Sequence, residues 1–259
     1  MDNYDNKYIW IIGASSGIGK ALAKNLAKQG ANLALSARSK SDLENLKKEL
    51  DEDTPTREHL IHPLDVSDLA SLNQAAKTIK STWPRVDSLI HLAAIYNPSS
   101  FEEMDIEAAH KLININFGGT LNVIHIALPL LKDGAMLREE KSQLVICGSV
   151  AGYCGLPNGQ PYSASKAAII NLVESLRAEE SDLDIRLISP GFVRTPLTDK
   201  NPFPMPFIIE PEEAAERIAT GLLSSRYEIQ FPRRLTWLMK ILKRLPAPLF
   251  FAITKRMVN

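Results

Sequence analysis

Cysteine is scarce in this chain of 259 residues, which contains only Cys147 and Cys154. Their spacing fits neither a metal pair nor a CxxC redox motif, so we expect two buried, reduced thiols and exclude a disulfide-stapled scaffold. Long apolar runs are missing as well. The first residues are acidic and the apolar run after them is short, which predicts neither a signal peptide nor a membrane span there. We therefore expect a cytoplasmic protein.

An excess of charge of either sign is also absent, since 30 basic residues balance 30 acidic ones. The composition is 45% hydrophobic and 23% charged, as in soluble globular proteins, which excludes a disordered or a collagen-like chain. Neither a fixed-period repeat nor a Gly/Ser linker divides the sequence. We therefore expect one domain over residues 1–259.

The charge is unevenly distributed, because residues 229–259 contain seven basic residues and no acidic one, whereas the first 228 contain 23 basic and 30 acidic residues. The seven are Arg233, Arg234, Lys240, Lys243, Arg244, Lys255 and Arg256. One helical face of this stretch is apolar, with Trp237, Leu238, Ile241, Leu242 and Leu245. We expect this basic amphipathic tail to dock on the body or on a partner subunit, and contact with an anionic membrane surface is the less favoured alternative. Nucleic-acid binding has little support, because the body is acidic and carries no binding motif.

Short apolar runs alternate with longer helical patterns up to residue 190. The expected strands cover residues 8–12, 32–36, 59–63, 88–93, 143–147 and 184–188. The expected helices cover residues 17–29, 41–50, 68–81, 105–131 and 161–179. This alternation predicts βαβ units and hence an α/β fold, a doubly wound, Rossmann-like parallel sheet with helices on both faces.

The pattern changes after the last expected strand. Residues 190–207 contain five prolines in eighteen positions, so this segment cannot be one helix or a central strand. Pro211 and the acidic residues after it then begin a helix that runs to about residue 223. We interpret residues 196–224 as a substrate lid. Its apolar residues, which suggest a lipophilic substrate, are Phe203, Met205, Phe207 and Ile208.

A glycine-rich turn, 13-GASSGIG-19, follows the first expected strand and leads into the first helix. Strand, glycine turn and helix together present backbone N–H groups and a helix N-terminus to a phosphate. Gly13 permits the tight turn, Gly17 allows the phosphate to approach, and Gly19 lets the helix pack on its strand. We expect the cofactor to contact Ser15, Ser16 and Ile18 as well.

Tyr162 and Lys166 stand four residues apart on one face of an expected helix. An adjacent ammonium favours the phenolate and lowers the pKa of a phenol, which suits a general acid for a carbonyl oxygen near neutral pH. Ser149 follows the fifth expected strand, at the edge of the sheet where ligands bind in such folds. It is placed to orient and polarise the same oxygen.

The GxxxGxG turn and the Tyr162-Ser-Ala-Ser-Lys166 pair make the sequence resemble the short-chain dehydrogenase/reductase family over most of its length. The resemblance adds Asp65 as a partner of the adenine amino group and Thr195 as a neighbour of the nicotinamide carboxamide. It further implies cofactor contacts for Lys166, which holds the ribose, and for Tyr162. The remaining implied cofactor residues are Val66, Ala93, Pro190, Gly191 and Val193.

The resemblance also implies a reaction, in which a nicotinamide cofactor exchanges a hydride with a ketone, an aldehyde or an alcohol while Tyr162 moves the proton. Asn116 matches the family asparagine that bends its helix and holds a water linking the lysine to solvent. An asparagine in mid-helix has a poor helix propensity, which fits a specific role. Helices 105–131 and 161–179 are then expected to form a homodimer or homotetramer interface.

The second expected strand ends without the acidic residue that an NAD site uses to hold the ribose hydroxyls. Ala37 leaves room there, and the guanidinium of Arg38 can pair with a 2′-phosphate and stack on adenine. NADP(H) is therefore the favoured cofactor. NAD(H) remains possible, because Ser16 stands where NADP-preferring members often carry a second basic residue.

One segment departs from the family pattern, because residues 91–94 read His-Leu-Ala-Ala where members usually show Asn-Asn-Ala-Gly. We interpret His91 as a structural histidine, and Ala94 tolerates the turn only if its φ is negative. The departure leaves open a second function class, a catalytically weak dinucleotide sensor or scaffold. No metal site is expected, since the other histidines lack ligand spacing. They are His59, His62, His110 and His125.

Overall fold

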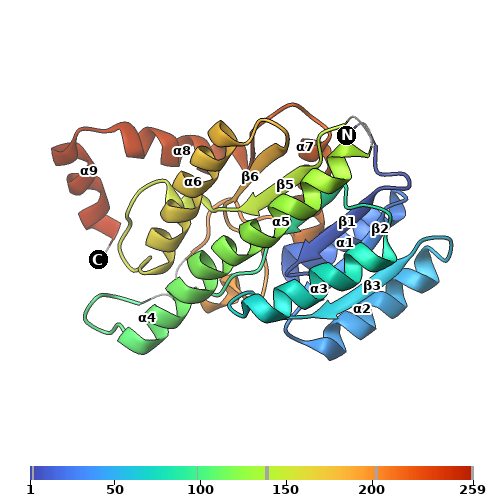
Figure 1. The fold of residues 1–259 in the computed structure, drawn as a ribbon. Coiled ribbons are helices and arrows are strands. Elements are labelled where there is room, and N and C mark those ends of the chain that lie inside the picture. The colour runs from blue at the N-terminus through green and yellow to red at the C-terminus, as the bar shows by residue number, and fades with distance from the viewer. Residues whose placement is uncertain (2, 98, 138–139, 202–203, 258–259) are drawn as a thin grey trace.

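A computed structural model describes residues 1, 3–97, 99–137, 140–201 and 204–257. In this described part the chain forms one seven-stranded sheet, parallel throughout, in the order β3-β2-β1-β4-β5-β6-β7 (Figure 1). The strands are β1 (Tyr8–Ile12), β2 (Asn32–Ala37), β3 (His59–Pro63), β4 (Ser88–His91), β5 (Gln143–Cys147), β6 (Asp184–Pro190) and β7 (Glu228–Phe231). The helices are α1 (Gly17–Lys28), α2 (Lys40–Asp53), α3 (Leu69–Thr82), α4 (Ile106–Ile113), α5 (Gly119–Met136), α6 (Tyr162–Glu179), α7 (Pro211–Leu222), α8 (Arg233–Arg244) and α9 (Ala247–Thr254).

Two apolar cores cover the two faces of the sheet. Successive side chains of β1 point to opposite faces, so that Trp10 and Ile12 enter one core and Ile9 and Ile11 the other. Helices α3, α5, α6 and α8 contribute to the first core, and α1, α2 and α7 to the second. The predicted α/β fold, a doubly wound parallel sheet, is therefore confirmed.

The strand order reverses beside β1, because β2 pairs on one side of it and β4 on the other. In open α/β sheets the loops diverge at such a point and leave a crevice at the carboxyl ends of the strands. The glycine-rich turn follows β1, and residues 92–95 follow β4, at this edge. The topology thus brings the predicted site residues to one place.

Several element boundaries differ from the sequence-based prediction. Strand β7 was not expected, and it makes the start of the predicted tail part of the sheet, paired with β6. Helix α7 belongs to the body and not to a lid, since its small apolar face packs in the second core. The helix expected over residues 105–131 runs from α4 to α5 through a π-helical turn, Asn114–Gly118.

The C-terminal helix α8 docks on the body, but only in part through the face that the sequence pattern predicts, since Leu242 and the adjacent Leu245 of that face pack against the first core. Leu235, Met239 and Leu242 are buried in the first core, whereas Trp237, Leu238 and Ile241 remain exposed. The docked residues follow a spacing of four and three, and this stripe shares Leu242 with the predicted face. Within the described residues, no helix combines the length and the apolar composition that crossing a bilayer requires.

Candidate active site

A cavity of about 780 Å³ lies at the carboxyl edge of the sheet. Every residue predicted to act in catalysis or to bind the cofactor lines this cavity, with the exception of Asn116. The lining set comprises Gly13, Ser15, Ser16, Gly17, Ile18, Gly19, Arg38, Asp65, Val66, Ala93, Ser149, Tyr162, Lys166, Pro190, Gly191, Val193 and Thr195. The structure thus brings together residues that are spread over most of the sequence.

The glycine turn fits a dinucleotide phosphate in its backbone geometry. Gly13 and Gly17 have φ values of +94° and +51°, which residues with a side chain rarely adopt. A Cβ on Gly17 would lie 2.9 Å from Thr195 Cγ2, so the turn and the segment after β6 meet across the cavity. Unlike α2, α3 and α4, helix α1 begins without a side chain that caps it, and unlike α2 and α4 it has no acidic residue in its first turn. Its N-terminal N–H groups are left for an anion in the cavity.

Arg38 and Asp65 lie at the end of the cavity beside β2 and β3. Arg38 is exposed and, among the residues that the structure describes, makes no hydrogen bond or ion pair. Asp65 Oδ1 accepts hydrogen bonds from Ser67 Oγ at 2.6 Å and Ser67 N at 2.9 Å, which hold the pKa of its carboxyl below the usual value, with help from Arg38. Asp42 also lines the cavity, a contact that the sequence reasoning missed.

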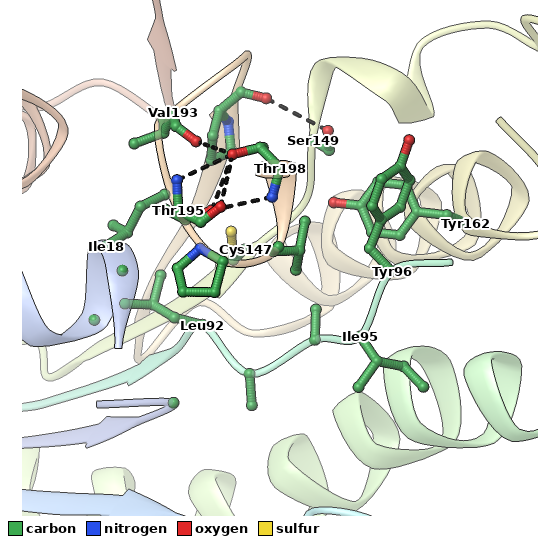
Figure 2. Close-up of a pocket in the computed structure, with 18 of the residues that line it drawn as sticks. Ile18, Leu92, Ile95, Tyr96, Cys147, Ser149, Tyr162, Val193, Thr195 and Thr198 are labelled. Atoms are coloured by element: carbon green, nitrogen blue, oxygen red, sulfur yellow. Dashed lines mark hydrogen bonds between the residues drawn. The ribbon is translucent and has the colours of Figure 1, made fainter. Parts of the chain in front are cut away.

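Tyr162, Lys166 and Ser149 also line the cavity. Figure 2 shows Tyr162 and Ser149 there. Lys166 Nζ lies 5.7 Å from the centroid of the Tyr162 ring and donates a hydrogen bond to Cys147 O at 2.8 Å. Ser149 Oγ accepts a hydrogen bond from Ala151 N at 3.1 Å. It donates to Pro190 O at 3.4 Å, a long and weak contact. The Ser149 hydroxyl can therefore give up this contact and donate its proton to a ligand with little loss of free energy.

Burial controls the protonation of this group. It raises the pKa of Tyr162 above the usual value for a phenol, and the Ser149 hydroxyl offsets only part of that rise. Burial also lowers the pKa of the Lys166 ammonium. The direction for Tyr162 is opposite to the expectation from its pairing with Lys166, because desolvation by burial dominates. In this geometry the phenol is protonated at neutral pH.

Asn116 is buried behind the cavity wall, within the π-helical turn Asn114–Gly118. Its Oδ1 accepts a hydrogen bond from Ile95 N at 2.8 Å, and its Nδ2 donates to Ile95 O at 3.0 Å and to Ser165 Oγ at 3.3 Å. The long helix is thus interrupted by a π-helical turn at the predicted asparagine, and the bend itself stays a prediction. The amide fixes the loop after β4 against helix α6, and it does not line the cavity.

Tyr96 is a cavity residue that the sequence reasoning missed. Its ring meets the Tyr162 ring edge-on with centroids 4.8 Å apart (Figure 2). Its hydroxyl donates to Asn201 Oδ1 at 2.7 Å, and Lys200 Nζ donates to Tyr96 O at 3.1 Å. Two hydrogen bonds therefore join the loop after β4 to the proline-rich segment. No local sequence signal announces a contact between positions this far apart in the chain.

The proline-rich segment contributes other residues to the cavity than those predicted. Met205, Phe207 and Ile208 do not line it, and Phe203 lies outside the described residues. Hydrogen bonds from Arg194 N to Ile209 O and from Ile209 N to Phe192 O tie the two ends of the segment together. The segment turns its first residues inward, and those in the lining are Pro196, Leu197, Thr198 and Asn201.

His91, at the end of β4, is buried as a structural residue. Its Nε2 lies 3.2 Å from Thr120 Oγ1, which donates its own proton to Asn116 O at 2.6 Å. His91 Nε2 therefore carries the proton of this contact, and Nδ1 has no hydrogen-bond partner in the described structure. The φ of Ala94 is not positive, so the turn that usually holds a glycine accepts alanine.

We expect His91 to make the protein acid-sensitive. Burial, followed by the nearby Lys166 charge, lowers its pKa from 6.5 to about 3. Since the unfolded chain takes up the proton first, the stability is fully present above pH 6.5 and falls as the pH drops, by roughly 2 kcal/mol at about pH 5. Urea unfolding at several pH values should show this slope reduced in His91→Asn but not in the exposed control His110→Gln. An unchanged slope in His91→Asn would contradict the prediction.

Comparison with known proteins gives one consistent result. A family model described as short chain dehydrogenase matches residues 7–203. An uncharacterized oxidoreductase of Myxococcus xanthus is 30% identical over 249 residues, which cover 95% of this chain and 96% of that protein. The 3-oxoacyl-(acyl-carrier-protein) reductase of Thermotoga maritima is 30% identical over 228 residues, 83% of this chain and 89% of the reductase. The solved alcohol dehydrogenase of Thermococcus sibiricus, complexed with 5-hydroxy-NADP, has a TM-score of 0.79 at 28% identity and covers 88% of this chain and 96% of its own.

Proposed function

The chain belongs to the short-chain dehydrogenase family, and from this premise we propose that it interconverts a carbonyl compound and an alcohol with NADP(H), on a lipophilic substrate. As a member of this family it is an oxidoreductase that uses a nicotinamide dinucleotide on CH–OH and C=O groups. The observation that carries the proposal is the position of Ser149, Tyr162 and Lys166 around the cavity that the glycine turn also lines.

The roles of these side chains follow from their contacts. When bound, the nicotinamide supplies or accepts the hydride. In reduction Tyr162 donates its proton to the carbonyl oxygen, since burial keeps the phenol protonated. Ser149 donates a hydrogen bond to the same oxygen, in place of its weak contact with Pro190 O. Lys166 has three N–H donors and uses one on Cys147 O, so two remain for the ribose hydroxyls.

Asn116 acts as a positioning residue in this scheme. Its amide holds the backbone of Ile95 and the hydroxyl of Ser165, and Ser165 lies in the same helix turn as Tyr162 and Lys166. The loop after β4 and helix α6 therefore keep a fixed separation across the cavity. The predicted relay of protons through Asn116 remains part of the proposal.

The preference for NADP(H) rests on Arg38. Its guanidinium is exposed at the cavity and is free of a partner among the described residues, while Ala37 leaves room for a 2′-phosphate. A planar guanidinium can pair with that phosphate through two parallel hydrogen bonds. The carboxylate of Asp42 also lines the cavity, which tempers the preference and keeps NAD(H) possible.

We expect Arg38→Ala to weaken NADPH binding by about 10- to 100-fold, since a charge-assisted pair with the 2′-phosphate is lost. NADH, which lacks that phosphate, should bind as before. Fluorescence titration of both nucleotides measures this, with Lys40→Ala as the control, because Lys40 is a neighbouring cation outside the cavity lining. An equal loss of affinity for both nucleotides, or none, would argue against the assignment.

A lipophilic substrate is supported by the apolar residues in the lining of the cavity that Tyr162 and Tyr96 share. Ile95, Leu156 and Leu197 line the cavity together with Phe192. Burial of apolar substrate surface against such side chains is favourable at about 25 cal/mol per Å². These residues replace the predicted lid residues as the support for this part of the proposal.

The assembly and the location complete the proposal. Ile106, Ile113 and Leu121 are exposed on α4 and α5, which supports a homodimer or homotetramer formed through these helices and α6. Cys147 and Cys154 are both free thiols, partly exposed rather than buried, and free thiols suit the reducing cytoplasm.

A further inference from the structure

The outer side of the two C-terminal helices carries exposed apolar residues next to cations. On α8, Arg234, Trp237, Leu238 and Ile241 follow the spacing of one helix face, and Trp237 is 67% exposed. On α9, Leu249 and Ile253 lie four residues apart and are also exposed, as is Phe251. Figure 1 shows α9 extending from the end of α8, away from the sheet. We call these apolar residues and the cations Arg234, Arg244, Lys255 and Arg256 the C-terminal surface.

The exposed face of α8 cannot turn inward, because the opposite face is fixed to the body. Leu235, Met239 and Leu242 are buried in the first core, and a Cβ on Gly191 would lie 2.7 Å from Leu235 Cδ2. Lys240 Nζ also donates to Glu228 Oε2 at 2.7 Å, and Glu228 is the first residue of β7. The apolar residues of the C-terminal surface therefore need a partner outside this subunit.

The charge of the C-terminal surface defines that partner. Residues 229–259 contain no acidic residue, and the four cations of the surface have no ion-pair partner within the described chain. A second copy in a two-fold contact would set these cations against the same cations, which is repulsive. A nucleic acid would satisfy the cations but would leave the exposed tryptophan, phenylalanine and aliphatic side chains without an apolar partner.

We propose that the C-terminal surface docks on an anionic phospholipid bilayer. A bilayer interface meets both requirements, since it accepts apolar and aromatic side chains at the level of the headgroups and attracts cations through its negative surface potential. Lys and Arg side chains beside the apolar face can bury their methylene stems and keep their charges at the phosphates. The contact is peripheral, and it places helix α8, which covers Gly191 of the active-site cavity, at the lipid surface.

The test is co-sedimentation of the full-length protein with vesicles at low ionic strength. We expect binding to vesicles of an equal mixture of phosphatidylcholine and phosphatidylglycerol, little binding to phosphatidylcholine alone, and release as salt is added. Lys255→Glu/Arg256→Glu should lower the partition coefficient by about 30-fold or more. Lys48→Glu/Lys77→Glu changes the net charge equally at two exposed sites elsewhere and should have a much smaller effect.

A second pair of variants tests the apolar part. Trp237→Ser should lower partition about tenfold, as expected for an indole that leaves water on binding, whereas Phe101→Ser, at an 80% exposed residue outside the surface, should not. Failure to sediment with the mixed vesicles, or equal binding to both vesicle types, would overturn the proposal. So would a dimer that dissociates in Trp237→Ser, because it would assign the surface to a second copy. All variants change exposed side chains, and an unaltered nucleotide titration verifies that they fold.

Discussion

Tyr162→Phe is expected to lower kcat by about a thousandfold, within the range that loss of a general acid produces. The substitution removes one oxygen and leaves the ring, whose edge-on contact with Tyr96 at 4.8 Å between centroids is retained. The nucleotide still has the glycine turn, the start of α1 and Lys166 as partners, so NADPH affinity should change little. Steady-state reduction of carbonyl compounds, followed at the NADPH absorbance, measures the first effect and a fluorescence titration the second.

Tyr96→Phe is the matched control, since it removes a phenolic hydroxyl from the neighbouring ring in the same cavity. That hydroxyl donates to Asn201 Oδ1, so its loss should loosen the proline-rich segment and raise KM while kcat falls by less than about tenfold. Equal losses of kcat in both variants would mean that Tyr162 is not the proton donor. If the unmodified protein binds nucleotide but turns over no carbonyl compound, the sensor or scaffold interpretation, motivated by His91-Leu92-Ala93-Ala94, replaces the enzyme.

The residues of the cavity could be predicted from sequence where a short motif fixes the local backbone. The glycine turn (residues 13–19) and the Tyr162–Lys166 pair are each short segments of sequence. The order of the strands brings both to one edge of the sheet. The structural role of His91 could also be predicted from its position in the sequence. A buried position at the end of a central strand leaves the histidine neutral, and Thr120 accepts the hydrogen bond from its N–H group.

What the sequence could not predict depends on contacts between distant segments. Tyr96 and Asn201 are 105 positions apart, and only the folded proline-rich segment brings them together. The same folding turns Leu197 into the cavity and leaves Phe207 exposed, although both are apolar. Helix α8 has two apolar stripes that share Leu242, and its sequence pattern alone does not tell which of them docks on the body.

The motif also did not predict the direction in which the pKa of Tyr162 is shifted. A spacing of four residues predicts that an ammonium lies close to the phenol, but it does not predict how deeply either group is buried. In the structure, desolvation raises the pKa of Tyr162 and lowers that of Lys166, and the lysine proton is directed to Cys147 O. A motif can thus place two residues correctly and still not predict the direction of a pKa shift.

Gly19→Ala is expected to destabilise the protein by about 3 kcal/mol, although alanine is ordinarily the better helix former by about 0.5–1 kcal/mol. A Cβ at this position would lie 1.9 Å from Gly13 O and 2.8 Å from Gly13 C. Both atoms belong to the backbone of the glycine turn, so neither can rotate away as a side chain would, and α1 must move off the turn. The midpoint of urea unfolding measures the loss.

The same displacement should abolish tight nucleotide binding. The N–H groups at the start of α1 and the turn at Ser15 and Ser16 form one wall of the cavity, and moving the helix separates them from any phosphate held there. We expect NADPH affinity to fall by about two orders of magnitude, as for the loss of more than one charge-assisted hydrogen bond. Gly155→Ala is the matched control, because the nearest atom to its Cβ would be Gln160 Nε2 at 3.9 Å and its φ is not positive. The prediction is contradicted if Gly19→Ala has the same urea midpoint and the same NADPH affinity as Gly155→Ala. In that case α1 does not pack as closely on the turn as its contact with Gly13 requires, and the phosphate site lies elsewhere.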